Sequence, residues 1–391
     1  MTLFFYIFAS MKRMLTIGIL LLCLLAACNS KKQVPEPVEG PSKELSAIDS
    51  LMWRQPDSAL AVLMDYLDDG GRDGVHTVST NVTFDNHYAN LLLAELLYKN
   101  DYAQTNRPEL LEAVGYFDSL VAADTRGGTD TRGVSLQGPR RRDARRTSAQ
   151  NTAFLTARAH YINGVGYYEH DSVVEACKEY LKALGVMEEN FEEKELVEKK
   201  AKFMALTYTH LTDLFSDLYL HEIAICFGKL SLAYYQKYDA EAGHIAWMLN
   251  NIGSHYDIMS NYDSAYYYYS QGIAVLSDTN SLIYRGIETH LAFLSYKMGV
   301  SPSFLTNQLH GLLVDAKSNQ EYASRCLTIG EIYYHERQFD SAWYYLNIAY
   351  NQTINVPTKK QAAEWLVEIG EAHGKNKEAS EFAMFLVLLQ T

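Results

Sequence analysis

The sequence predicts an all-α fold, a solenoid of repeated helical hairpins, and three observations support it. Apolar residues recur at helical spacing from about residue 42 onward, with few segments that alternate as strands do. Only 8 of the 391 residues are prolines, which suits long helices because proline interrupts helix interiors. One residue pattern also occurs three times without a gap, as expected of stacked helical units.

The first 27 residues are predicted to be a bacterial lipoprotein signal peptide. A basic Met-Lys-Arg start at 11–13 precedes an apolar stretch of signal-peptide length at 14–25. The following Leu-Ala-Ala-Cys at 25–28 resembles the bacterial lipobox, whose cysteine carries diacylglycerol. A membrane-spanning helix is the alternative, but the apolar stretch is short for a span. We expect cleavage before Cys28 and lipid on its thiol, with Met11 as a candidate translation start.

Residues 28–42 carry three prolines among polar residues and are predicted to be a flexible tether. The lipoprotein resemblance implies a place in the bacterial cell envelope, facing either the periplasm or the cell surface. Residue 30, two positions after the acylated Cys28, is Ser and not Asp. By resemblance to other lipoproteins, this favours the outer membrane.

The mature chain is strongly acidic. Without Lys12 and Arg13 of the leader it keeps 32 basic and 47 acidic residues, a net charge of −15. A surface of this sign repels nucleic acid, so we expect no nucleic-acid partner.

The repeated pattern is Gly-x2-Tyr-x8-Ala-x3 followed by a large side chain. A small residue lets a second helix approach closely, and the alanine fits where the helices cross. Asp-Ser-Ala recurs at 57–59, 263–265 and 340–342, and its aspartate is predicted to be the N-cap of the second helix. The three copies are Gly164, Tyr167, Ala176 and Tyr180; Gly253, Tyr256, Ala265 and Tyr269; and Gly330, Tyr333, Ala342 and Leu346.

These residues resemble the tetratricopeptide repeat (TPR) family, in particular TPR lipoproteins of the Bacteroidota. The resemblance covers residues 43–391 and implies a right-handed α-solenoid of about seven or eight TPR-like hairpins. Residues 124–150 do not fit the pattern. They contain Asp-Thr-Arg-Gly twice and an arginine-rich run, so we predict a disordered insertion there, with a basic arm as the alternative.

No catalytic motif stands out. The His-Glu pairs at 221 and 335 lack the second histidine of a zinc-protease helix, and the Gly-Val-Gly at 164–166 lacks a third glycine. We therefore expect no enzymatic activity, no cofactor and no metal. Three cysteines, Cys177, Cys226 and Cys326, are predicted to be buried free thiols on helices, with disulfides as the alternative.

TPR arrays bind partners on the concave face of their first helices, so the resemblance implies a groove there. It would be acidic and punctuated by aromatics, which suits a basic or polar protein or peptide. The alternative is that tyrosines such as those at 266–269 pack repeat against repeat. The candidate groove residues are Tyr98, Arg158, Tyr161, Tyr168, Asp213, Asp217, Trp247, Asn250, Asp257, Glu331, Tyr334, His335, Glu364 and Glu368.

The sequence leaves three functions open. The first is a non-catalytic scaffold that binds a protein or peptide in the cell envelope. The second is a truncated sensor or regulator, because the last segment is apolar and no polar capping helix follows it. The third is a glycan-binding lipoprotein for nutrient uptake, which the lack of a long aromatic loop disfavours.

We predict that Cys28→Ser abolishes lipidation, because only a thiol at this position can carry the diacylglycerol. In cells fed radiolabelled palmitate, the wild-type protein should be labelled and sediment with membranes, whereas the variant should be unlabelled. Cys226→Ser is the matched control and should retain the label. Equal labelling of all three proteins would disprove the lipobox assignment.

Overall fold

A computed structural model describes residues 41–69, 80–100, 102, 108–126, 139–192, 195–196, 198–238, 241–279, 281–301, 307, 309–311, 313, 316 and 318–389. Helices dominate these residues and no strand occurs among them, so the all-α prediction is confirmed. The expected signal peptide and nearly all of the expected tether lie outside the described residues.

The chain forms two compact units that divide between Leu214 and Phe215. The helices of the first are α2 (Lys43–Met52), α3 (Pro56–Asp69), α4 (Thr80–Lys99), α5 (Pro108–Arg126), α6 (Pro139–Glu169), α7 (Val173–Asn190) and most of α8 (Glu198–Asp217). Those of the second are α9 (His221–Tyr238), α10 (Ala242–Ile258), α11 (Tyr262–Ala274), α12 (Leu282–Lys297), α14 (Asn319–His335), α15 (Phe339–Gln352), α16 (Val356–Ala372) and α17 (Asn376–Leu388).

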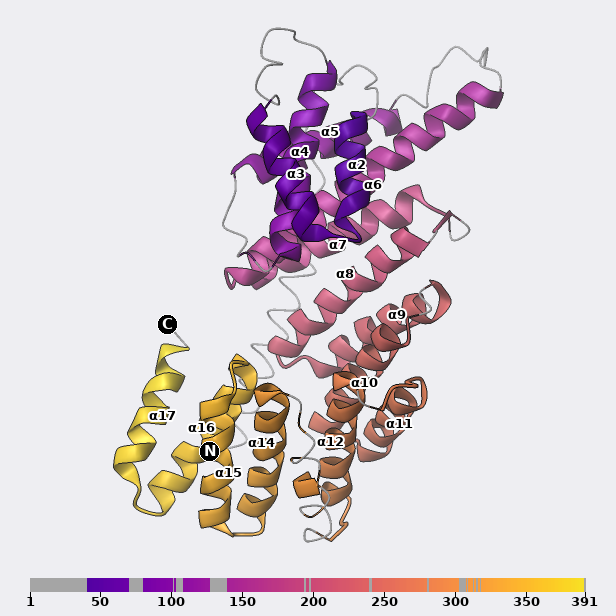
Figure 1. The fold of residues 1–391 in the computed structure, drawn as a ribbon. Coiled ribbons are helices and arrows are strands. Elements are labelled where there is room, and N and C mark those ends of the chain that lie inside the picture. Colours follow the sequence, from indigo (N-terminus) through magenta and orange to yellow (C-terminus); the bar gives the residue numbers. More distant parts are fainter. Residues whose placement is uncertain are drawn as a thin grey trace, which may run out of the picture. The chain divides into compact units, whose positions relative to one another are not determined.

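Consecutive helices pack as hairpins. The most extensively packed pairs are α6 with α7, α14 with α15, α10 with α11, and α16 with α17. Neighbouring hairpins also touch, because α15 packs on α16 and α11 on α12. In the second unit, α14, α15, α16 and α17 stand next to one another in sequence order (Figure 1). This is the arrangement that the TPR-like pattern predicts.

The glycines of the repeated pattern lie where two helices come closest. A Cβ atom on Gly253 would stand 2.7 Å from the ring of Tyr269, and one on Gly330 would stand 2.7 Å from Leu346. Gly164 meets Tyr180 in the same way, at 2.8 Å. The glycine that begins the pattern therefore lies directly against the large side chain that ends it, and only glycine leaves enough space for this contact.

The turns between paired helices share one hydrogen-bond pattern. Ser260, between α10 and α11, has a φ of 59°, and its N–H donates to Asp257, while Asn261 N–H donates to Tyr256. This is a Schellman motif, which ends a helix through one left-handed residue. The equivalent left-handed residues of the other turns are Asp171, Tyr219, Gly299, Arg337 and Gly374.

The predicted N-caps need correction. The N-cap of α11 is Asn261 and that of α15 is Gln338, so Asp263 and Asp340 are the second residues of their helices. Asp57 has the same place in α3. These aspartates still favour the helix start, because a negative charge in the first turn interacts well with the helix dipole.

The described parts of the insertion expected at 124–150 are helical and not disordered. Residues up to Arg126 complete α5, and α6 begins at Pro139, while residues 127–138 lie outside the described part. The arginine-rich stretch is helical, and its C-terminal end is anchored by side chains. Arg146 pairs with Glu195 at 2.6 Å, and Gln150 donates to the same carboxylate at 3.0 Å.

The cysteine prediction holds at two of three positions. Cys177 and Cys326 are buried free thiols, whereas Cys226 is a free thiol exposed on α9. Burial of Cys226 is predicted because the repeat expects a core side chain there, but Ala224 and Ile225 take the buried side of the helix and Cys226 lies on the exposed side. In the described part of the chain, no helix has the length and apolar character needed to span a membrane.

We predict that Gly253→Ala destabilises the protein by about 1–3 kcal/mol, because the added methyl group must displace the buried ring of Tyr269. Gly286→Ala is the control, since a Cβ there meets no atom within 4 Å and alanine favours a helix. Urea unfolding of both variants checks the prediction. It is wrong if Gly253→Ala is as stable as Gly286→Ala.

Candidate partner-binding face

The first helices of the hairpins in the second unit, α10, α12, α14 and α16, contact one another in sequence order. Polar and aromatic side chains join them into a continuous set, which we call the first-helix ladder. Its members are Asn250, Asp257, His290, Tyr296, Lys297, Glu331, Tyr334, His335, Glu336, Trp365 and Glu368.

Two polar contacts join α10 to α12. The Asn250 side-chain oxygen lies 2.8 Å from His290 Nδ1. Two helical turns further along both helices, Lys297 Nζ donates to both carboxylate oxygens of Asp257, at 2.9 and 2.8 Å. Trp247 lies one turn before Asn250 and is 37% exposed, so it stands at the edge of the same helix face.

Aromatic contacts join α14 to α16. The rings of Tyr334 and Trp365 are 4.5 Å apart, and His335 meets Trp365 edge-on at 5.6 Å. The Tyr334 hydroxyl donates to Glu368. His335 and Glu368 are exposed, as is Glu364 one turn before Glu368. The end of the ladder therefore presents ring edges and carboxylates to solvent.

Between these pairs, α12 is joined to α14. The Tyr296 hydroxyl donates to Glu336 at 3.0 Å, and its ring stacks with His335 at 6.4 Å. Burial lowers the pKa of His335, and the charge of Lys297 acts in the same direction. The imidazole is therefore mainly neutral near pH 7 and adds little positive charge to the face.

Glu331 was expected on the groove surface, but it is only 4% exposed and lies beneath it. Its carboxylate accepts hydrogen bonds from Trp365 Nε1, at 2.9 Å, and from Gln361. Burial raises the pKa of Glu331 to about 7, although both hydrogen bonds and Lys297 favour the charged form. Glu331 thus fixes the tryptophan of the face instead of contacting a partner itself.

Arg158 in the first unit is also buried, contrary to the expectation that it faces a groove. Its guanidinium donates to Glu95 at 2.8 Å and to Asp49 at 2.8 Å, and Lys199 reaches Asp49 at 3.3 Å. Burial opposes the charge of Arg158, but the two carboxylates raise its pKa well above the usual value. These charges join α2, α4, α6 and α8, so Arg158 stabilises the fold.

Tyr161 is buried as well and belongs to a cluster around His210. Its hydroxyl lies 2.9 Å from His210 Nε2, and the hydroxyls of Tyr98 and Tyr180 lie 3.2 and 3.4 Å from the same imidazole. Burial lowers the pKa of His210 to about 4, so the ring is neutral at pH 7.

The other expected groove residues of this region differ in exposure. Tyr168 and Asp213 are partly buried and lie near Tyr180, whereas Asp217 is exposed near the end of α8. Of the candidate groove residues, the ladder in the second unit includes Asn250, Asp257, Glu331, Tyr334, His335 and Glu368.

Sequence reasoning missed Lys297, Trp365 and His210. Trp365 could have been found, because it stands next to Glu364 on a helix already assigned to the groove. Lys297 and His210 gave no signal of their own, since each acquires its role from residues 30 or more positions away. Within the described residues, no group of three or more His, Cys, Asp or Glu side chains could hold a metal ion.

Comparison with known proteins identifies the fold only. No protein-family model and no curated protein sequence matches the chain. Among solved structures, the apo form of RapI matches with a TM-score of 0.52 and 10% identity, over 88% of this chain and 86% of that one. NprR in complex with its cognate peptide NprX matches with a TM-score of 0.51 and 14% identity, over 89% of each chain. Both are TPR-like helical-repeat proteins, so this chain has a TPR-type fold.

We predict that Glu331→Gln changes the pH dependence of stability. The folded pKa of about 7 exceeds the ordinary value of 4.5, so folded wild-type protein holds this proton over a range where unfolded protein releases it. This group's contribution to stability is present below about pH 4.5 and is lost as the pH rises through 7. Glutamine keeps the acceptor oxygen without the charge, and the variant should gain roughly 2–3 kcal/mol relative to wild type by pH 8.

Urea unfolding at pH 5 and pH 8 measures this difference. Glu364→Gln, an exposed substitution on α16, is the control and should stay within about 0.5 kcal/mol of wild type at both pH values. An equal stability difference between Glu331→Gln and wild type at the two pH values would contradict the role of the buried carboxyl.

Proposed function

We propose that this protein is a non-catalytic scaffold that binds a basic or polar protein segment on the first-helix ladder. In this proposal, lipid on Cys28 tethers it to the bacterial cell envelope, at the outer membrane. The observation that carries the binding role is the ladder itself, a continuous face of carboxylates and aromatic rings formed by four successive first helices.

The charge of the ladder favours a basic partner. Asp257, Glu336 and Glu368 are acidic, and Glu364 lies beside them, whereas Lys297 is the basic residue of the ladder and is already paired with Asp257. Lysine or arginine side chains of a partner would therefore meet carboxylates that the ladder does not neutralise. Such complementarity raises the association rate and selects the partner by charge.

The aromatic residues supply contact area. Tyr334, His335 and Trp365 form one connected ring cluster, and the buried carboxylate of Glu331 holds the tryptophan in place. Tyrosine and tryptophan fixed in this way contribute strongly to protein interfaces, because little side-chain entropy is lost on binding.

The fold is compatible with this role. NprR, which matches this chain in fold, was solved in complex with a peptide. Because the identity is 14%, this supports only the ability of such a fold to hold a peptide. The lipid anchor rests on the Leu-Ala-Ala-Cys sequence at 25–28.

We predict that a photo-crosslinking amino acid at position 335 forms adducts with a partner in intact cells. p-Benzoylphenylalanine in place of His335 would project from the ladder, whereas the same residue in place of Tyr344 would project from the second helix α15, where the side chain is 61% exposed. Adducts should form at 335 and be absent at 344.

Charge variants sharpen the result. Glu364→Gln combined with Glu368→Gln should reduce the adducts at 335 several-fold, because the partner loses two carboxylate contacts, and added salt should act in the same direction. Adducts of equal intensity at positions 335 and 344, or none at either, would contradict the assignment of the ladder as the binding face.

A further inference from the structure

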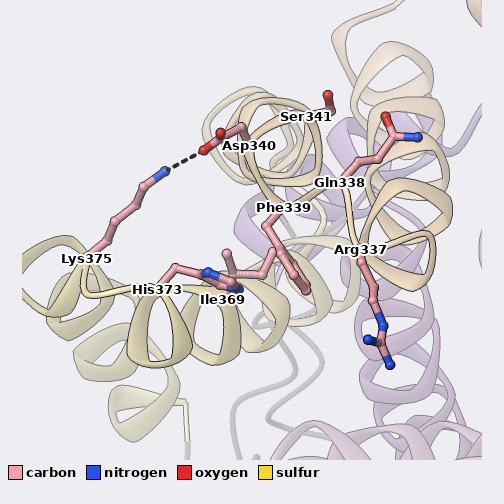
Figure 2. Close-up of a pocket in the computed structure, with 8 residues that line it drawn as sticks. All are labelled: Arg337, Gln338, Phe339, Asp340, Ser341, Ile369, His373 and Lys375. Atoms are coloured by element: carbon pink, nitrogen blue, oxygen red, sulfur yellow. Dashed lines mark ion pairs between the residues drawn. The ribbon is translucent and has the colours of Figure 1, made fainter.

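A pocket of 530 Å³ opens between the α14–α15 turn and the α16–α17 turn. Figure 2 shows Phe339 near its centre, with Arg337 on one side and His373 and Ile369 on the other. We call it the turn pocket. Its lining residues are Arg337, Gln338, Phe339, Asp340, Ser341, Ile369, His373 and Lys375.

Basic side chains prevail in the turn pocket. Arg337 and Lys375 line it, against one acid, Asp340. The Asp340 side chain is fully exposed and lies 3.7 Å from Lys375, a loose surface pair. Within the described residues, the Arg337 guanidinium has neither an ion pair nor a hydrogen bond, so it is available to an anion.

The backbone presents Arg337 in an unusual conformation. Its φ is 59°, in the left-handed region that glycine adopts freely, and it is the left-handed residue of the Schellman turn after α14. Gly299 and Gly374 occupy the same place in the α12 and α16 turns. The turn therefore does not need an arginine, and glycine would form it with less strain.

The wall beside Arg337 and Lys375 is apolar and aromatic. The Phe339 and His373 rings lie 4.1 Å apart, and Ile369 is buried next to them. A pocket with an unpaired guanidinium beside an apolar wall fits an anion attached to a carbon chain better than an inorganic ion. The terminal residue of a peptide combines a carboxylate with a side chain in this way, and guanidinium binds carboxylate through two parallel hydrogen bonds.

The turn pocket adjoins the first-helix ladder. The Phe339 ring meets the Tyr334 ring edge-on at 5.9 Å, and the Tyr334 hydroxyl donates to Glu368. A cationic pocket and an acidic face are thus separated by one tyrosine. A ligand that spans both must carry positive charge close to a negative group.

We propose that the turn pocket binds the C-terminal carboxylate of the segment whose basic side chains lie on the ladder. The partner is then a polypeptide with lysine or arginine within its last few residues and a free C-terminus. This inference rests on the proposed function, because it assumes that the ladder holds a peptide.

Fluorescence anisotropy with labelled peptides tests the proposal on the mature protein. The probe is fluorescein-Gly-Lys-Lys-Tyr-Lys-Leu with a free C-terminus, the free acid. It is compared with the same peptide amidated at its C-terminus, the simple amide. A third peptide, the glutamate amide, is amidated and has glutamate in place of the last leucine. The free acid should bind roughly tenfold more tightly than the simple amide, as expected for one charge-assisted hydrogen-bond pair. The glutamate amide should bind no better than the simple amide.

Arg337→Gly separates ligand binding from folding. It should abolish the preference for the free acid while the melting temperature stays equal or rises, because glycine relieves the left-handed strain. Lys377→Ala removes one positive charge from the exposed surface of α17 and should keep the preference. Glu368→Gln should weaken the binding of the free-acid peptide and of the simple amide by the same factor.

The outcomes distinguish the two proposals. Equal affinity for acid and amide, or an unchanged preference in Arg337→Gly, overturns the turn-pocket assignment and leaves the ladder as the binding face. Equal affinity for the free acid and the glutamate amide overturns the requirement for a C-terminus. Absence of binding by all three peptides contradicts the proposed function itself.

Discussion

The close approach of paired helices is the constraint on which the rest of the structure depends. Gly164, Gly253 and Gly330 stand opposite large side chains, and even one added carbon would stand 2.7 or 2.8 Å from them. These contacts hold each second helix tightly against its first helix. The Schellman turns then end the first helices in the same way from hairpin to hairpin. The first helices of the second unit consequently stand side by side, and their polar side chains can meet.

Both units bury charged side chains that join helices. In the first unit, Arg158 is enclosed with Asp49 and Glu95 and joins helices that are distant in sequence. His160 acts similarly, held between Asp118 and Glu179, and these hydrogen bonds outweigh burial and raise its pKa to about 9. Removing one partner from a buried ion pair of this kind is strongly destabilising, because the other charge remains uncompensated. Such networks fix the position of helices and leave little charge for a ligand.

In the second unit, Arg325 and Arg285 are likewise enclosed with Glu321, at 2.5 and 3.1 Å, and join α12 to α14. The charged groups of the ladder lie nearer the surface. Asp257 and Lys297 neutralise each other, while Glu368 remains exposed beside Tyr334. Within the ladder, Glu331 is buried under Trp365 and keeps that ring in position. An exposed acidic rim over a rigid aromatic base suits selective binding of a basic segment, because charge selects the partner and the fixed rings provide contact area.

The sequence by itself determined the all-α fold, the repeated hairpins and the glycine contacts, because these follow from local periodicity and from residues in adjacent helices. It also identified several ladder residues, such as Asn250, Asp257 and Tyr334, from their places in the repeat. Only the tertiary structure decided which polar residues are buried. Arg158 and Glu331 have the helical register of surface residues, yet partners 30 or more positions away enclose them. The turn pocket likewise arises where two separate turns meet, and no local pattern encodes that meeting.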